Sequence, residues 1–258
     1  MISTWKKFKL TIIGSGTMMP TKKRHPSCYL LEIGEKKILL DIGHTSIARL
    51  IEMGIDLNSI DILFISHFHT DHFADALPLV HSLWVDGLRR FRGKYKPLTI
   101  IGPESIKERW EKLRKIFWVE PKEHYPLKFI AGVKKISIDE AKIELFEVTH
   151  VPFYQSIGIK VKFQNKIFIY TGDIGGDHSA KKLKQTAKNA DLLLIEAGYL
   201  NPTPNHFTID QVAQITQEAG VKKTIATHLR DAYLPALKEK IKGQKKIILA
   251  EDLMKMSI

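Results

Sequence analysis

The chain has 258 residues, and its 40 lysines and arginines outnumber its 28 aspartates and glutamates, giving a formal net charge of +12. Its single cysteine, Cys28, excludes an intramolecular disulfide framework and a cysteine-rich zinc finger. No apolar run reaches the roughly 18 residues that span a bilayer, and the first residues lack the pattern of a signal peptide. We therefore expect a cytoplasmic protein without membrane contact. The positive charge favours an anionic partner without identifying it.

The first half of the chain alternates apolar runs of strand length with helical patterns. Gly14 and Gly16 break the first run, and Gly34 stands in a plausible hairpin turn. Gly54 stands where the C-terminal cap of a helix is expected. We expect strands at residues 8–13, 28–33, 37–40, 61–66 and 98–102, and helices at residues 45–53, 73–84 and 104–118.

The second half returns to strands and then alternates them with helices. We expect strands at residues 142–148, 157–163, 166–170, 191–195 and 223–226, and helices near residues 180–189, 208–219 and 233–241. The two halves echo each other, because residues 36–43 and 165–173 each end a strand with an aspartate beside a glycine. This alternation predicts an α/β protein, with one domain over residues 1–258 built from similar halves of about 1–135 and 136–258.

The stretch SHFHTDH carries the strongest chemical signal in the chain. It places His67, His69, Asp71 and His72 within six residues, directly after a buried strand. His67 and His69 project to the same side if the backbone is extended, whereas the following turn directs Asp71 and His72 elsewhere. Packing does not explain such a cluster, since each buried polar group needs its own hydrogen-bond partner. The arrangement therefore predicts two neighbouring metal ions.

Two metal ions need further ligands, and the second half supplies them at predicted strand ends. His150, Asp173 and His228 each follow an apolar strand. The ends of strands in α/β sheets are where functional side chains converge. Taken singly, a strand-end aspartate is often a helix cap and a strand-end histidine is often merely exposed. Together these three residues complete a dimetal ligand set.

With these residues in place, the sequence resembles the metallo-β-lactamase superfamily and, within it, the ribonuclease Z-like phosphodiesterase branch. The opening LTIIGSGTMMPTKKRHPSCYLLEIGEKKILLDIG, the SHFHTDH motif, and then VTH, YTGD and ATHL occur in that branch's order. The resemblance covers nearly the whole chain. It implies an αββα four-layer sandwich, with two mixed β-sheets in the middle and helices on the outer faces.

The resemblance also implies a role for each matched residue. One metal is held by His67, His69 and His150, the other by Asp71, His72 and His228, and Asp173 bridges both. Asp71 also orients the nucleophile or accepts its proton. His206, in the stretch NHFTIDQV, contacts the scissile phosphate and protonates the leaving oxygen. The alternative for His206 is that it merely precedes a helix capped by Thr208.

The implied reaction is hydrolysis of a phosphodiester by a hydroxide that bridges two divalent metals. Zinc fits the histidine and aspartate ligands best, and manganese and iron stay open. The only cysteine lies far from the position where antibiotic-cleaving zinc enzymes of the superfamily commonly use one. Two other readings stay open: a hydrolase of a small sulfate ester, lactone or other small molecule, and a non-catalytic nucleic-acid-binding module.

The expected substrate is an anionic phosphodiester, with RNA, including a tRNA precursor, as one candidate. Full-length ribonuclease Z enzymes carry a tRNA-gripping insertion between the motifs that match His150 and Asp173, but only 22 residues separate these positions here. The basic, aromatic region of residues 89–118 is a candidate substitute, although its helical part also reads as an amphipathic helix with a solvated basic side. Because members of the branch are often dimers, a homodimer is among the expected assemblies.

Overall fold

The fold is described from a computed structural model, which covers residues 8–117 and 124–258 and, within these, leaves the side chains of residues 177–179 undescribed. The start of the chain and Trp118, which ends the predicted helix of residues 104–118, lie outside the described residues. Among the described residues, no helix combines the length and the apolar character needed to cross a membrane.

The described strands form two sheets of seven. The first sheet has the order β14-β1-β2-β3-β4-β5-β6, and the second has the order β13-β12-β11-β10-β9-β8-β7. The first contains β1 (Phe8–Gly14), β2 (Cys28–Ile33), β3 (Lys36–Ile42), β4 (Ile62–Phe64), β5 (Leu98–Gly102), β6 (Leu127–Ala131) and β14 (Lys255–Ser257). The second contains β7 (Lys135–Ile138), β8 (Ala141–Val148), β9 (Ser156–Phe163), β10 (Lys166–Tyr170), β11 (Leu192–Glu196), β12 (Thr224–Thr227) and β13 (Ile247–Leu249).

Both sheets are mixed, as predicted. Strands β3 to β6 pair in parallel in the first sheet, and strands β10 to β13 do so in the second. The remaining pairs are antiparallel, including β14 with β1, where Ile258 N donates to Phe8 O at 2.9 Å. The first sheet thus draws on both ends of the described chain. The expected division into halves near residue 135 stays a prediction.

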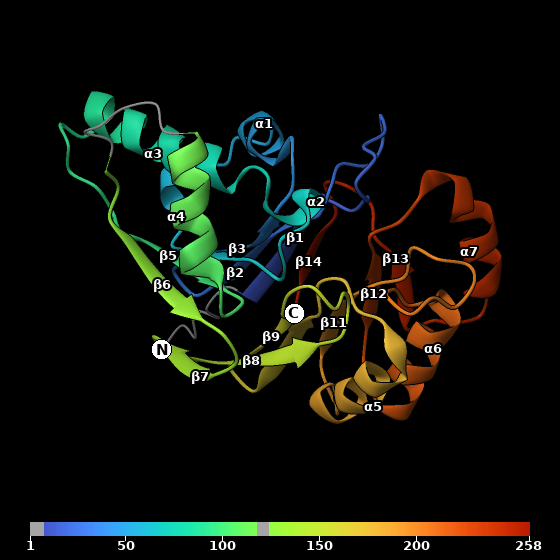
Figure 1. The fold of residues 1–258 in the computed structure, drawn as a ribbon. Coiled ribbons are helices and arrows are strands. Elements are labelled where there is room, and N and C mark those ends of the chain that lie inside the picture. The colour runs from blue at the N-terminus through green and yellow to red at the C-terminus, as the bar shows by residue number, and fades with distance from the viewer. Residues whose placement is uncertain (1–7, 118–123) are drawn as a thin grey trace, which may run out of the picture.

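Helices cover the outer face of each sheet (Figure 1). On the first sheet lie α1 (Ser46–Glu52), α3 (Ala76–Arg90) and α4 (Ile106–Ile116), and on the second lie α5 (Gly176–Thr186), α6 (Ile209–Glu218) and α7 (Leu234–Lys240). The short α2 (Thr70–Phe73) and two 3₁₀ turns, Leu57–Ser59 and Asp231–Tyr233, complete the helical elements. This arrangement is the predicted αββα sandwich.

Three apolar clusters hold these four layers together. The middle cluster joins the two sheets and contains the aromatic pair Phe64 and Tyr170, whose ring centroids lie 6.2 Å apart. One outer cluster packs Trp110 of α4 against the first sheet, and the other packs Val212 of α6 against the second. Strand β2 is buried along its whole length because side chains of both its faces enter a cluster.

The predicted helix at residues 73–84 corresponds to α3, which begins at Ala76 and continues to Arg90, and a break separates it from the one-turn helix α2. The break allows Asp71 and His72 to lie in the one-turn helix α2, while α3 presents Leu79 and Leu83 to the first sheet. The 22 residues between His150 and Asp173 hold β9 and β10 and no inserted arm.

Candidate metal centre

The predicted ligands follow strands at one end of the sandwich. Strand β4 leads into the SHFHTDH loop, β8 ends before His150, β10 before Asp173, and β12 before His228. The two sheets meet here, because Ile157 N of the second sheet donates to Ser66 O at 3.0 Å. The carboxyl ends of these strands therefore bring side chains that are distant in sequence to one place.

One group of side chains comprises His67, His69, His150 and Asp173. His69 Nδ1 lies 3.0 Å from His67 Nε2 and 3.2 Å from His150 Nε2. Oδ2 of Asp173 faces this group, at 4.0 Å from His67 Nε2 and 3.8 Å from His150 Nε2. Three converging imidazole nitrogens and one carboxylate form a donor set that zinc-type cations accept.

A second group comprises the buried residues Asp71, His72 and His228. Oδ2 of Asp71 lies 3.2 Å from His228 Nε2 and 3.8 Å from His72 Nε2. The carboxylate of Asp173 faces this group as well, because its Oδ1 is 3.2 Å from His72 Nε2 and its Oδ2 is 3.5 Å from His228 Nε2. Asp173 thus lies between the two groups.

Three buried atoms around the second group have no hydrogen-bond partner among the described residues. They are His72 Nε2, Asp173 Oδ1 and His228 Nδ1. An unpaired buried polar atom costs about 1–3 kcal/mol, so such atoms need an explanation. A divalent cation in the second group would coordinate His72 Nε2 and Asp173 Oδ1. The donor set and these atoms therefore fit two metal ions.

Asp41, at the end of β3, orients the second group from beneath. Its carboxylate accepts hydrogen bonds from Ser66 N at 2.7 Å and Tyr170 Oη at 2.5 Å, and its Oδ2 lies 2.7 Å from His72 Nδ1. On the other side, His150 Nδ1 donates to Asn205 O at 2.8 Å. Because the Nδ1 atoms of both imidazoles are engaged, their Nε2 atoms face the centre.

Backbone conformation also aims these side chains. His228 has a φ of 57°, in the left-handed region that non-glycine residues seldom adopt. A Cβ atom at Gly198 would lie 2.1 Å from His228 O, so only glycine fits beside this turn. Gly172 precedes Asp173 with a φ of 62°, and its missing side chain makes room for Ser66. Strain of this kind is concentrated at functional sites.

His206 lies beside the first group, next to the carboxylate of Glu196, which the sequence motifs do not indicate. Its Nδ1 is 2.8 Å from Oε2 of Glu196 and 3.9 Å from Oδ2 of Asp173. Glu196 ends β11 and also accepts from Ile174 N at 2.6 Å. Thr208 does cap α6, so the alternative given for His206 describes the helix correctly. His206 does more than precede this helix, however, because its ring also contacts the carboxylate of Glu196.

Burial and charge shift the pKa values of the centre in opposite directions. Desolvation lowers the pKa of His67, His69 and His150. Burial acts against His72 too, but the carboxylates of Asp173, Asp71 and Asp41 raise its pKa well above the ordinary value. Although burial opposes it, the neighbouring His72 and His228 lower the pKa of Asp71 to about 2. Three of the four histidines are therefore neutral near pH 7.

Glu196 and His206 lie within hydrogen-bond distance of each other, with Nδ1 of His206 2.8 Å from Oε2 of Glu196. Burial and the charge of Asp173 raise the pKa of Glu196, while desolvation lowers the pKa of His206 to about 4. Both shifts favour the neutral form of the side chain, which is the protonated carboxyl for Glu196 and the unprotonated imidazole for His206. At neutral pH we therefore expect the pair to share a single proton between Nδ1 and the carboxylate.

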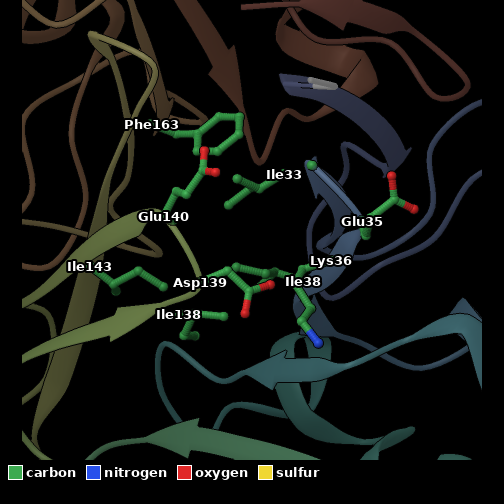
Figure 2. A pocket seen from close by; sticks show the side chains of 11 residues that line it. Ile33, Glu35, Lys36, Ile38, Ile138, Asp139, Glu140, Ile143 and Phe163 are labelled. Atoms are coloured by element: carbon green, nitrogen blue, oxygen red, sulfur yellow. The ribbon is translucent and has the colours of Figure 1, made fainter. Parts of the chain in front are cut away.

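The centre opens into a cavity of about 500 Å³. Its walls include Met18, Met19, His206, Tyr199 and Arg230 beside the metal-binding side chains. A smaller hollow of about 130 Å³ lies at the opposite end of the sandwich, between the β2–β3 and β7–β8 turns (Figure 2). Isoleucines and Phe163 line it together with charged side chains of the two turns, and because no histidine is among them it offers no comparable metal-binding chemistry.

The basic region of residues 89–118 lies apart from this cavity. None of its described residues lines the cavity wall. Trp110 and Ile106 are buried against the first sheet, whereas the lysines of α4 are exposed, which is the amphipathic arrangement named above. A role of this region in substrate binding stays a prediction.

Comparisons with known proteins agree with this geometry. A family model described as Anti-Pycsar protein Apyc1 matches residues 8–251. The chain belongs to this family. Ribonuclease Z of Methanosarcina mazei is 23% identical, over 97% of this chain and 98% of the relative.

Two solved structures share the fold. The metallo-β-lactamase fold protein YhfI of Bacillus subtilis has a TM-score of 0.81 and 21% identity, covering 98% of this chain and all of that one. The short form of human tRNase Z has a TM-score of 0.75 and 21% identity, covering 97% and 99%. These matches confirm the predicted metallo-β-lactamase fold and the ribonuclease Z-like resemblance. The motifs in the sequence did not by themselves indicate the Apyc1 family, which only the family model shows.

Proposed function

We propose that the chain hydrolyses phosphodiesters with two divalent metal ions held at this centre. The observation that carries the proposal is the position of Asp173 between two groups of buried imidazoles, within 4.0 Å of nitrogens in both. Relatives named Ribonuclease Z support phosphodiesters as the substrate class. The formal charge of +12 is compatible with an anionic substrate.

The ligand roles follow from the two groups. We propose that His67, His69 and His150 bind one ion, that Asp71, His72 and His228 bind the other, and that Asp173 bridges them. Zinc fits these nitrogen and oxygen donors, and manganese and iron stay alternatives. When bound, two such ions supply Lewis acidity and lower the pKa of water from 15.7 towards about 7.

The protein's own groups then have separate tasks. Asp71, with its pKa near 2, is ionised at neutral pH and can orient the attacking water or accept its proton. Glu196 and His206 contact each other beside the cavity, whose wall includes His206. Because Glu196 engages Nδ1 of His206, the Nε2 atom of that ring is left to contact the scissile phosphate and to pass a proton to the leaving oxygen.

Substrate size separates two versions of the proposal. The relatives' name favours RNA, including a tRNA precursor. The cavity of about 500 Å³ and the absence of an arm between His150 and Asp173 favour a small nucleotide-like diester. The alternative to both versions is hydrolysis of a sulfate ester or a lactone, in which a different type of bond is cleaved.

Activity assays on metal-loaded protein test the proposal. We expect cleavage of bis(p-nitrophenyl) phosphate that is lost with a chelator, restored by zinc or manganese, and lost in His69→Ala. His81→Ala, on α3 and outside the centre, is the matched control. Cleavage of an aryl sulfate or a lactone in place of the diester would disprove the proposed reaction. A tRNA precursor assayed at low salt, where backbone contacts are strongest, then separates the RNA version from the small-diester version.

A further inference from the structure

Part of the cavity wall is formed by a loop to which the proposed reaction assigns no role. This cavity loop comprises residues 15–25, between β1 and β2, and contains no helix or strand. Its two ends meet, because Gly16 N donates to His25 O at 2.7 Å. Four of its side chains line the cavity beside the metal-binding residues: Thr17, Met18, Met19 and Thr21. The position of the cavity loop therefore affects the space that is open to a substrate.

The base of the cavity loop is fixed by a carboxylate from the C-terminal part of the sequence. Oδ1 of Asp252 accepts from Ser15 N at 2.8 Å and from Ser15 Oγ at 2.7 Å. Its Oδ2 accepts from His25 N at 2.9 Å. The side chain of Asp252 is 4% exposed. Both ends of the loop are therefore held by one buried residue, whereas the part between them needs a separate attachment.

Arg24 and Asp231 supply that attachment. Arg24 is buried, and its Nη1 donates to Ser15 Oγ at 2.6 Å and to Ala250 O at 2.5 Å. Its Nε donates to Oδ1 of Asp231 at 3.0 Å, and Thr21 Oγ1 donates to Oδ2 of the same carboxylate at 2.6 Å. Hydrogen bonds that involve a charged group are roughly twice as strong as neutral ones. Both oxygens of Asp231 thus bind the loop close to the side chains that line the cavity.

The cavity loop contacts both segments that carry ligands of the second group. Asp231 follows His228 by three residues. Met18 Sδ accepts from Thr70 Oγ1 at 3.0 Å, and Thr70 directly precedes Asp71. Figure 1 shows the loop in blue beside α2. The loop therefore reaches from one of these segments to the other, next to the place where the scissile diester is expected.

We propose that Arg24 and Asp231 are positioning residues that hold the cavity loop against the metal centre and so restrict the substrate to diesters with a small retained group. The retained group is the one that stays on phosphorus when the leaving oxygen departs. The inference rests on the proposed function for the position of the diester. With the loop held, a bulky retained group has to displace Met18 and Met19, whereas a small one fits a wall that is already in place.

Two diesters with the same leaving group test this inference. Methyl p-nitrophenyl phosphate and bis(p-nitrophenyl) phosphate both release p-nitrophenolate, but the first retains a methyl group and the second a nitrophenyl group. The ratio of kcat/KM for the bulky diester to that for the small one is compared between metal-loaded variants. We expect Asp231→Ala and Arg24→Met to raise this ratio about fivefold, the scale of one hydrogen bond, and mainly through KM. Asp231→Asn, which keeps one oxygen acceptor, should raise the ratio less.

The controls separate positioning of the loop from general destabilisation. Asp61→Ala removes a carboxylate with similar contacts outside the cavity wall, because Asp61 accepts from Lys37 N and Lys96 Nζ, each at 2.9 Å. This variant should keep the wild-type ratio. The double variant Arg24→Met/Asp231→Ala should match the larger single effect, since both residues act through one pair. An unchanged ratio in the single variants, equal losses on both diesters, or fully additive effects would overturn the inference.

Trypsin gives a readout that needs neither metal nor turnover. Lys22 and Lys23 are exposed in the cavity loop, and a protease cleaves a folded protein where a segment opens locally. We expect cleavage after these lysines, identified by mass spectrometry, to be about tenfold faster in Asp231→Ala than in wild type and unchanged in Asp61→Ala. Equal rates in Asp231→Ala and wild type would contradict the inference alone. Failure of wild-type protein to cleave either diester would contradict the proposed function, while the trypsin result still decides whether Asp231 holds the loop.

Discussion

The two ends of the sandwich are built from the same sheets but enclose different kinds of side chain. At the metal centre, His67, His72, His150 and Asp173 are buried, and some of their atoms lack hydrogen-bond partners within the described part of the chain. At the other end, Phe163 and aliphatic side chains line a small hollow together with charged side chains of the two turns, such as Glu140 (Figure 2). The polar end carries the candidate chemistry, whereas the packing at the other end contributes to the stability of the fold. Activity and stability should therefore respond to different residues.

Backbone strain marks the same contrast. Asp139 has a φ of 49° at the distal end, where it begins the two-residue turn between β7 and β8, a place that favours the left-handed region. His228 and Asp41, with φ values of 57° and 55°, lie in no such hairpin turn. Their conformations aim an imidazole and a carboxylate at the centre. The left-handed conformation of Asp139 forms a turn, whereas those of His228 and Asp41 position side chains of the metal centre.

The largest expected effect is at the residue between the two metal groups. Asp173→Asn keeps the shape but removes the negative charge that faces both groups, so we expect kcat/KM on bis(p-nitrophenyl) phosphate to fall at least ~10³-fold, with less bound metal by elemental analysis. Asp210→Asn, on the exposed face of α6, is the control and should keep wild-type activity. Near-normal activity of Asp173→Asn would show that Asp173 does not bridge the ions.

The distal end should show the reverse pattern. Phe163 is 4% exposed and packs edge-on against Phe8, with ring centroids 5.6 Å apart. Phe163→Ala should lower the free energy of unfolding by about 3–5 kcal/mol, as measured by urea denaturation. The kcat/KM of the folded fraction should stay within about twofold of wild type. A large loss of activity in folded protein would show that the two ends are coupled.

Glu196→Gln gives the next smaller effect on activity. The amide can still accept from Ile174 N, but it no longer supplies the carboxylate that shares a proton with His206. We expect kcat/KM to fall about 10²-fold and the pH–rate profile to change shape, since general acid–base steps contribute about 10²–10⁴-fold. Glu218→Gln, exposed on α6, is the matched control. An unchanged pH profile would argue for a structural role of Glu196.

Metal-free protein should lose stability as the pH falls from about 7 to 5. The lowered pKa values of His67, His69 and His150 mean that the unfolded chain, with ordinary values near 6.5, binds protons that the folded chain refuses. His72, with a raised pKa, acts in the opposite direction and supports folding below its unfolded value. Urea denaturation of chelator-treated protein between pH 5 and 8 measures the balance. The same slope is expected in Phe163→Ala, and a different slope there would break the separation of the two ends.

The smallest effect is a gain. Ala141 begins β8, is 2% exposed and lines the distal hollow of about 130 Å³. Ala141→Val adds two methyl groups to this space and suits a strand, so unfolding should become harder by about 0.5–1 kcal/mol. Activity should not change. Destabilisation by more than about 1 kcal/mol would show that the hollow is too narrow for the added groups.

The sequence predicted central strands better than edge strands. Residues 28–33, 98–102 and 166–170 match β2, β5 and β10, because their apolar runs are buried. The strands that were not predicted, β6, β7, β13 and β14, are the four edges of the two sheets. An edge strand buries fewer side chains, as the alternation of exposed and half-buried residues in Lys135–Ile138 shows. Their weak patterns therefore resemble loops.

The candidate site was predictable where the spacing of residues is unusual and not where it is ordinary. The SHFHTDH motif alone is enough to indicate its histidines and aspartate as metal ligands. The structure brings them together with His150, Asp173 and His228. Glu196 was missed because a single glutamate at the end of an apolar strand is common. Its position between the strands that deliver Asp173 and His228 was the available signal. Arg24 and Asp231 were missed because they lie 207 residues apart and only the fold brings them into contact.

The pairing of β14 with β1 has a consequence for the order of folding during synthesis. Residues 255–257 leave the ribosome after every other strand of both sheets, yet they complete the first sheet, whose remaining strands lie within residues 8–131. Until then β1 is an open edge with unpaired backbone groups, which is a template for wrong association. The second sheet, by contrast, has all its strands once residue 249 has emerged. The second sheet can therefore close first, leaving β1 exposed until residues 255–257 have emerged.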